Sequence, residues 1–214
     1  MERGCLSALW EAMEADPSFG GVDAIITNQC YHPLGRISRK FFNWLNGCAR
    51  DCFAGRVVAG IAAFHPEDRE GREPIVLTEW LASGCVLYRR SALPDPPFDP
   101  FFDGYSYGED LALSLVVARN WRLANTRKAR AFHDATPGAS RLGAMEFARM
   151  SLVNRHHILT RILGRGTIAG GIRLTVFELF SIASTLRSAE GWARLPAVIV
   201  GKVRGIWQVL GNRR

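Results

Sequence analysis

The residues best suited to chemistry lie between positions 80 and 133 of this 214-residue chain. Two adjacent carboxylates, Glu109 and Asp110, open a predicted helix, and a carboxylate beside a substrate hydroxyl can act as a general base. His133 follows the next predicted strand, and a histidine can transfer a proton or bind a metal ion. Upstream, a strand-like run is interrupted by Gly84, which is typical of a bulge or of a place where a ligand approaches the backbone.

Each of these residues also has an ordinary structural explanation. An acidic pair at the start of a helix satisfies free backbone N–H groups and complements the helix dipole. Taken alone, His133 is better explained as a surface histidine, and Trp80 fits the core as well as it fits a platform for a sugar. The phenylalanines at 98, 101 and 102 are better explained as core and loop anchors. No single residue therefore indicates the function. The order and spacing of these residues along the chain are more informative.

The order and spacing of the whole stretch resemble the second half of the catalytic domain of family 2 glycosyltransferases, which are inverting enzymes of GT-A fold. The resemblance covers about 55 residues. Its parts are Trp-Leu-Ala-Ser-Gly-Cys at 80–85, Arg89-Arg90, Phe98-Asp99-Pro-Phe101-Phe102, Tyr105, Glu109-Asp110 and Phe132-His133.

The resemblance implies a role for each site residue. Asp110 would be the general base that takes the proton from an acceptor hydroxyl, and His133 would contribute to a metal or diphosphate site. The residues implied on the acceptor side are Trp80, Ser83, Gly84, Cys85 and Glu109. The cofactor implied is a divalent cation, Mg or Mn, and the substrates are a nucleotide-diphosphate sugar and a glycan or lipid-linked acceptor. The resemblance also implies work in surface-polysaccharide or cell-wall assembly.

The chain departs from the family pattern in two places. It contains no Asp-x-Asp sequence, the motif that binds the metal and the donor phosphates in the family. Residues 6–28 resemble the helix and strand that follow this motif, so we expect an acceptor-side portion that lacks the N-terminal nucleotide-binding half, with little activity alone. Ala112 and Leu115 stand where the family often has an acidic residue and an arginine. The alternative is a non-catalytic remnant of the fold that binds a membrane or a partner. A partner chain that supplies the missing half is a further alternative.

Hydrophobic periodicity and turn residues predict the elements that position these residues. We expect helices at 4–15 and 109–120, strands at 22–27, 79–90 and 121–126, and surface loops at 65–74 and 94–100. Residues 36–53 form either a helix or an ordered loop. These elements predict an α/β fold class, followed by a helical region over 141–214. The resemblance implies that residues 1–140 form a partial, Rossmann-like GT-A sheet in three αβα layers. Breaks in the helical region are expected at 164–171 and near Pro196.

Composition and charge restrict the kinds of partner that the chain is expected to bind. The chain is 48% hydrophobic, which excludes intrinsic disorder, and its net charge of +7 is uneven. Residues 1–140 hold 15 basic and 17 acidic residues, whereas residues 141–214 hold 12 basic and 3 acidic residues. Such a basic region favours an anionic partner. No helix-turn-helix, zinc or RNA-recognition pattern is present, so we expect no nucleic acid.

The apolar helices predicted at 168–186 and 195–210 carry Trp192 and Trp207 near their ends. They fit interfacial helices on an anionic membrane, and equally fit helices that pack back on the domain. No signal peptide is recognised, and no run of about 18 uncharged apolar residues predicts a conventional membrane span. The five cysteines have no metal-binding spacing and are expected to be reduced. Together these features predict a cytoplasmic location, either free or peripheral on the cytoplasmic face of the membrane.

Overall fold

The computed structural model describes residues 1–69, 73–134 and 142–211. The chain forms two compact units. The first comprises Met1–Pro100 and Glu109–Thr136, and the second comprises Phe101–Gly108 and Pro137–Arg214. The sequence predicted a boundary at residue 140, and the second unit also includes the short segment 101–108.

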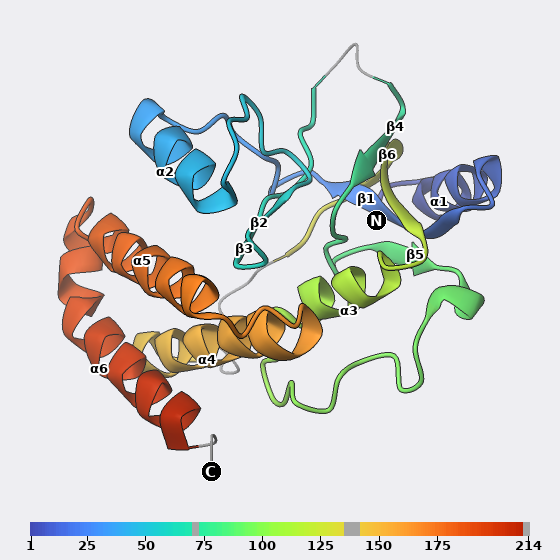
Figure 1. The fold of residues 1–214 in the computed structure, drawn as a ribbon. Coiled ribbons are helices and arrows are strands. Elements are labelled where there is room, and N and C mark those ends of the chain that lie inside the picture. Colours follow the sequence, from blue (N-terminus) through green and yellow to red (C-terminus); the bar gives the residue numbers. More distant parts are fainter. Residues whose placement is uncertain (70–72, 135–141, 212–214) are drawn as a thin grey trace. The chain divides into compact units, whose positions relative to one another are not determined.

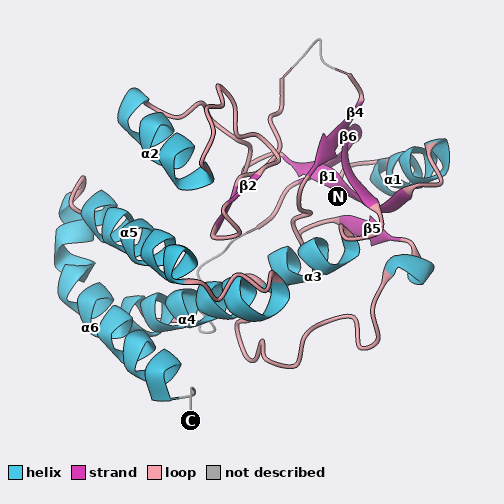
Figure 2. Cartoon of the chain, in the orientation of Figure 1, coloured by secondary structure: helices cyan, strands magenta, loops and turns pink. Residues whose placement is uncertain are grey.

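The first unit is built on a four-stranded mixed sheet (Figure 2). Its strands lie in the order β4 (Ile75–Thr78), β6 (Arg122–Ala131), β1 (Phe19–Ile26) and β5 (Val86–Tyr88). The two central strands, β1 and β6, are parallel, and each outer strand is antiparallel to its neighbour. Strand β1 is buried along its whole length, as its apolar sequence predicts for a strand covered on both faces.

Helices cover both faces of this sheet. Helix α1 (Cys5–Ala15) packs through Leu9 and Met13 on the face that presents Val22, Ala24 and Ile26 of β1. The alternate residues of β1 point to the other face, because side chains alternate along a strand. There Leu113 and Val117 of α3 (Glu109–Val117) pack with Leu81 and Leu123.

Two adjacent glycines allow close packing on the α3 face. A Cβ added at Gly20 would lie 2.5 Å from Cβ of Trp121, and one added at Gly21 would lie 2.5 Å from Cδ1 of Leu81. Side chains at positions 20 and 21 would therefore push this layer away from the sheet. The first unit thus has the helix–sheet–helix layering of an α/β fold, which confirms the predicted fold class at this level.

The remaining elements of the first unit surround the sheet (Figure 1). Helix α2 (Arg36–Asn46) settles the open alternative at 36–53 in favour of a helix, which ends at Gly47 in the left-handed conformation. Its Phe42 ring packs 4.9 Å from that of Phe64. A small hairpin joins β2 (Val57–Val58) to β3 (Ala62–Ala63), and a 3-10 turn η1 covers Arg90–Ala92.

The predicted strand at 79–90 is only partly correct. Regular pairing is confined to β5, and residues 79–85 form turns and irregular backbone. The reason is local, because side chains bind successive backbone N–H groups of this segment and take the place of a strand neighbour. The strand predicted at 121–126 is longer than expected and runs through the basic residues to Ala131. There Arg130 forms an ion pair with Asp68 at 2.7 Å.

The second unit is helical beyond its first segment. It contains α4 (Ala144–His157), which continues in a π-helical turn η2 (Ile158–Ile162), and then α5 (Ile168–Thr185) and α6 (Ala189–Gly211). The break before α5 is confirmed, but the break expected near Pro196 is wrong, because α6 continues through it. Close packing of α6 on α4 helps to hold the helix together there. A Cβ added at Gly201 would collide with the carbonyl oxygen of Met145.

Within the described residues, α5 alone is long and apolar enough to cross a membrane, judged by length and composition. It has 18 residues and a mean hydropathy of 1.3. The sequence-based expectation of no span rested on the charged residues of this stretch, Arg173 and Glu178.

Candidate functional site

The candidate site lies at the carboxyl ends of the two parallel strands, the usual ligand-binding edge of an α/β sheet. The residues that follow β1 and β6 are joined there. The Asn28 side chain donates to the carbonyl oxygen of His133 at 2.9 Å and accepts from its N–H at 3.1 Å. Nε2 of Gln29 lies 2.9 Å from Nδ1 of His133. The imidazole is thus exposed but held in place through one of its two nitrogens.

Beside this edge, side chains immobilise the backbone of residues 81–83. Three consecutive N–H groups each donate to a different side chain: Leu81 to Oγ of Ser114 at 2.9 Å, Ala82 to Oδ2 of Asp23 at 3.2 Å, and Ser83 to Oδ2 of Asp110 at 3.4 Å. Ser83 and Gly84 themselves are exposed. The arrangement presents an ordered, accessible turn directly beside the Asp110 carboxylate.

Asp110 lies half-buried in the first turn of α3. Burial raises the pKa of its carboxyl above the ordinary value, while hydrogen bonds from the N–H groups of Leu111 and Ser83 and the charge of His65 act in the opposite direction. A carboxylate with a raised pKa holds a proton more readily than one in water, as a general base requires.

A further residue, His65, belongs to this group although the sequence placed it in a surface loop. Its half-buried ring lies 5.1 Å from that of Trp80, edge to face. Burial lowers the pKa of His65, the charge of Asp110 raises it and that of His133 lowers it, so all three groups interact electrostatically. The one sequence signal that points to His65 is its position directly after the apolar run 61–64.

The other acceptor-side residues differ in their placement. Glu109 is half-buried next to Asp110 in α3. Trp80 is buried, and its Nε1 donates to the carbonyl oxygen of Phe64 at 2.8 Å. Because Phe64 directly precedes His65, this hydrogen bond helps to fix the backbone that carries His65. The structure therefore brings together five of the predicted residues, namely Trp80, Ser83, Gly84, Glu109 and Asp110, with His133 at the same edge.

Cys85 is not brought to this group. Its side chain lies in the core on the α1 face of the sheet, with Sγ 3.7 Å from Sγ of Cys5. Burial raises the pKa of the Cys85 thiol to about 11. A thiol that is buried on the opposite face cannot contact a ligand bound beside Asp110.

The residues that the structure describes do not fit a resident Mg or Mn ion. Across residues 1–69, 73–134 and 142–211, no three His, Cys, Asp or Glu side chains are grouped so that they could hold a metal. These hard cations prefer several oxygen ligands, whereas His133 offers nitrogen and already uses Nδ1. The metal role predicted for His133 therefore lacks the other ligands it would need within this part of the chain.

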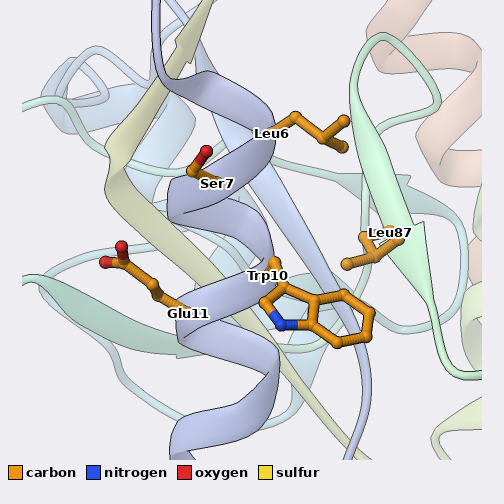
Figure 3. Close-up of a pocket in the computed structure, with 5 residues that line it drawn as sticks. All are labelled: Leu6, Ser7, Trp10, Glu11 and Leu87. Atoms are coloured by element: carbon orange, nitrogen blue, oxygen red, sulfur yellow. The ribbon is translucent and has the colours of Figure 1, made fainter.

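A separate hollow lies on the α1 face of the sheet (Figure 3). It has a volume of about 380 Å³ and is lined by Leu6, Ser7, Trp10 and Glu11 of α1 and by Leu87 of β5. Leu6 and Trp10 are 63% and 60% exposed. Because β5 is an outer strand of the sheet, this apolar hollow borders an unpaired strand edge.

No protein-family model, no curated protein and no solved structure matches this chain. The candidate site must therefore be judged on its own geometry and chemistry.

Proposed function

We propose that this chain is the acceptor-side part of a glycosyltransferase similar to family 2, with a partial GT-A fold and Asp110 as its general base. The observation that carries the proposal is the half-buried Asp110 carboxylate beside the exposed Ser83–Gly84 turn. A hydroxyl bound against that turn would lie within reach of a carboxylate whose pKa burial raises. The parallel β1–β6 pair between two helical layers supports the fold assignment.

The reaction proposed is an inverting transfer. Asp110 accepts the proton of the acceptor hydroxyl as the hydroxyl oxygen bonds to the anomeric carbon of a nucleotide-diphosphate sugar. The bond from that carbon to the diphosphate oxygen breaks, and its electron pair leaves with the nucleoside diphosphate. Glu109 orients the acceptor, and the 83–84 backbone allows a sugar ring to approach closely. The acceptor is a glycan or a lipid-linked sugar of surface-polysaccharide or cell-wall assembly.

We assign donor and cation binding to a further segment or partner chain. The sequence has no Asp-x-Asp motif, and the described residues contain no metal-binding group. The open edge of β5 and the apolar hollow formed by Leu6, Trp10 and Leu87 support this division, because a sheet that continues beyond β5 would cover both.

A non-catalytic remnant of the fold that binds a membrane or a partner is the second candidate. The lack of a metal-binding group among the described residues favours it. In that case Asp110 would act as a helix-capping residue with no part in proton transfer.

Acceptor binding by the full chain tests the proposal. A glycan array, followed by saturation-transfer NMR on the glycans that bind, should identify acceptors whose binding is lost in Asp110→Ala. The matched control Asp51→Asn removes a fully exposed carboxylate of the same unit and should bind as the unmodified chain does. Binding should also weaken as the pH falls and Asp110 becomes protonated, since the neutral acid accepts hydrogen bonds less well.

Three outcomes would contradict parts of the proposal. If no glycan binds, the acceptor site is wrong. If glycans bind equally to Asp110→Ala, and at every pH, the non-catalytic alternative is favoured. Sugar transfer by this chain alone would overturn the assignment of the donor site to another segment.

A further inference from the structure

Helices α5 and α6 each bury one charged side chain and expose several apolar side chains. Glu178 and Lys202 are only 6% and 7% exposed, whereas Ile168 is 85% and Trp207 is 71% exposed. A helix on the surface of a water-soluble domain normally shows the reverse pattern. Both helices depart from this pattern at Glu178 and Lys202, while Glu190, Arg194 and Arg204 of α6 stay exposed.

The buried Glu178 pairs with two basic side chains between the three long helices. Oε2 of Glu178 lies 2.5 Å from Nζ of Lys202, and Oε1 lies 3.1 Å from Nη1 of Arg155 on α4. Lys202 also donates to Oγ of Ser151 at 3.0 Å. The Arg155 guanidinium stacks over the Phe177 ring at 4.9 Å. Two of the charges that interrupt the apolar sequence of α5 and α6 are thereby removed from the outer surface.

Each of the two helices carries a stripe of exposed apolar side chains. On α6 its members recur at intervals of three, four and seven residues, as one face of a helix requires. We call this set the apolar face of the second unit; it consists of Trp192, Ile199, Val203, Ile206, Trp207 and Leu210 on α6, with Ile168, Ile172 and Leu179 on α5, all of them exposed.

Charge indicates what would cover this face. Each of the three acidic residues after position 141 pairs with a basic side chain: Glu146 with Arg149, Glu178 with Arg155 and Lys202, and Glu190 with Arg194. The 12 basic residues of this region therefore leave a large positive excess. Arg187, between the two helices, and Arg204, beside the stripe, are both exposed.

We propose that the apolar face binds an anionic lipid bilayer, with α5 and α6 lying in the interface between headgroups and acyl chains. Apolar side chains that lie between arginines, with a tryptophan near each end of the stripe, match the chemistry of that interface. A protein partner would more often meet a mixed surface with an acidic complement, whereas a second copy of this chain would bring like charges together. The proposal does not depend on the transferase assignment.

Vesicle sedimentation of the full chain tests the proposal. The chain should sediment with phosphatidylcholine vesicles that contain phosphatidylglycerol, less with phosphatidylcholine alone, and less at high salt. The double variant Val203→Glu, Leu210→Glu should lower the partition coefficient at least about tenfold, because it places two charges on the lipid-facing side. The double variant Ile37→Glu, Phe98→Glu is the matched control, since it puts two negative charges on exposed apolar residues of the first unit and should leave binding unchanged.

Two further measurements keep the proposal open to refutation. Brominated lipids should quench the fluorescence of the unmodified chain more than that of Trp207→Phe, because the indole of Trp207 would contact the acyl chains. Arg187→Gln with Arg204→Gln should weaken binding to the anionic vesicles about tenfold or more, and circular dichroism should show an unchanged helix content. The proposal is wrong if the chain does not bind anionic vesicles at low salt, or if the control variant in the first unit impairs binding as much as Val203→Glu, Leu210→Glu. It is also wrong if the latter variant abolishes only self-association, measured by ultracentrifugation.

Discussion

Asp23 and Asn125 are direct neighbours across the two central strands, and their side chains hydrogen bond at 2.8 Å. Each residue is only 1% exposed. The other carboxylate oxygen of Asp23 accepts from the N–H of Ala82, within the segment that also contacts Asp110. A buried acid thus joins the centre of the sheet to the turn at the candidate site.

This acid should make the stability of the fold depend on pH. Burial raises the pKa of Asp23 from 3.8 to about 7. Between these values the folded chain keeps a proton that the unfolded chain has released, so stability falls as the pH rises from about 4 to about 7. The loss is roughly 4 kcal/mol and is complete above the folded pKa. Urea unfolding of the unmodified chain across this range, compared with Asp23→Asn, isolates the effect from other carboxylates.

The Asp23→Asn variant resembles the protonated acid and should remove this part of the pH dependence. Above pH 7 it should be more stable than the unmodified chain, by up to roughly 4 kcal/mol. Oδ1 of Asn125 has no hydrogen-bond partner among the described residues. After the side-chain amide of Asn125 flips, this oxygen can accept a hydrogen bond from the amide introduced at position 23. Parallel pH profiles for the two proteins would show that Asp23 does not titrate in this range.

Ser114 should contribute strongly to the stability of the first unit, although its side chain is small. Its hydroxyl is fully buried and binds the N–H of Leu81, so Ser114→Ala leaves a buried donor without an acceptor. We expect a loss of about 1–3 kcal/mol in the free energy of unfolding, and faster hydrogen exchange at Leu81. Ser7→Ala, on the outer face of α1, is the control. Unchanged exchange at Leu81 would mean that the contact does not hold the 81–83 segment.

Removing one member of the buried ion network of the second unit should lower the free energy of unfolding strongly. Replacing all three members by apolar residues should lower it much less. Glu178→Gln leaves Arg155 and Lys202 buried without their counter-charge, and we expect a loss of about 3–5 kcal/mol in lipid-free buffer. The triple replacement Arg155→Met, Glu178→Leu, Lys202→Met should recover most of that loss, because no charge remains to be desolvated. If Glu178→Gln alone were as stable as the unmodified chain, the three charges would not be buried together.

A pair of glycines tests the packing of α6 on α4. Gly201→Ala places a methyl group against the Met145 carbonyl and should destabilise the second unit by about 1–3 kcal/mol. Gly171→Ala, in α5, meets open space and should stabilise by up to about 1 kcal/mol, because alanine favours helix. Thermal unfolding of the two variants should therefore shift in opposite directions. Shifts of the same sign would contradict the close approach at Gly201.

Long segments with a clear period could be predicted from the sequence, and short irregular ones could not. The apolar spacing in α1, the apolar run of β1 and the acidic start of α3 each define an element in a single local window. Strand β4 was missed because its four residues gain regular structure only by pairing with β6. Pro196 was misjudged because the packing around Gly201 opposes a break that local preference alone would favour.

Only part of the candidate site could be predicted from the sequence as well. The grouping of Asp110 with Ser83 was predicted, because it follows from the order of these residues along the chain. Asp23, Ser114 and His65 were not identified, because each acts through a partner far away in the sequence. The resemblance implied an acceptor-side position for Cys85, whereas its side chain lies on the α1 face. The backbone from 79 to 85 is not a strand, so side-chain direction cannot be counted along it.

The two thiols beneath α1 give the first unit its own reporter of local opening. Cys5 and Cys85 are 2% and 8% exposed and lie on elements 80 residues apart in the sequence, so a thiol reagent can reach them only after α1 separates from the sheet. The exposed Cys48 and Cys52 would react at once and mark the beginning of labelling. The time between the two reactions would measure how often this layer of the fold detaches while the rest remains folded.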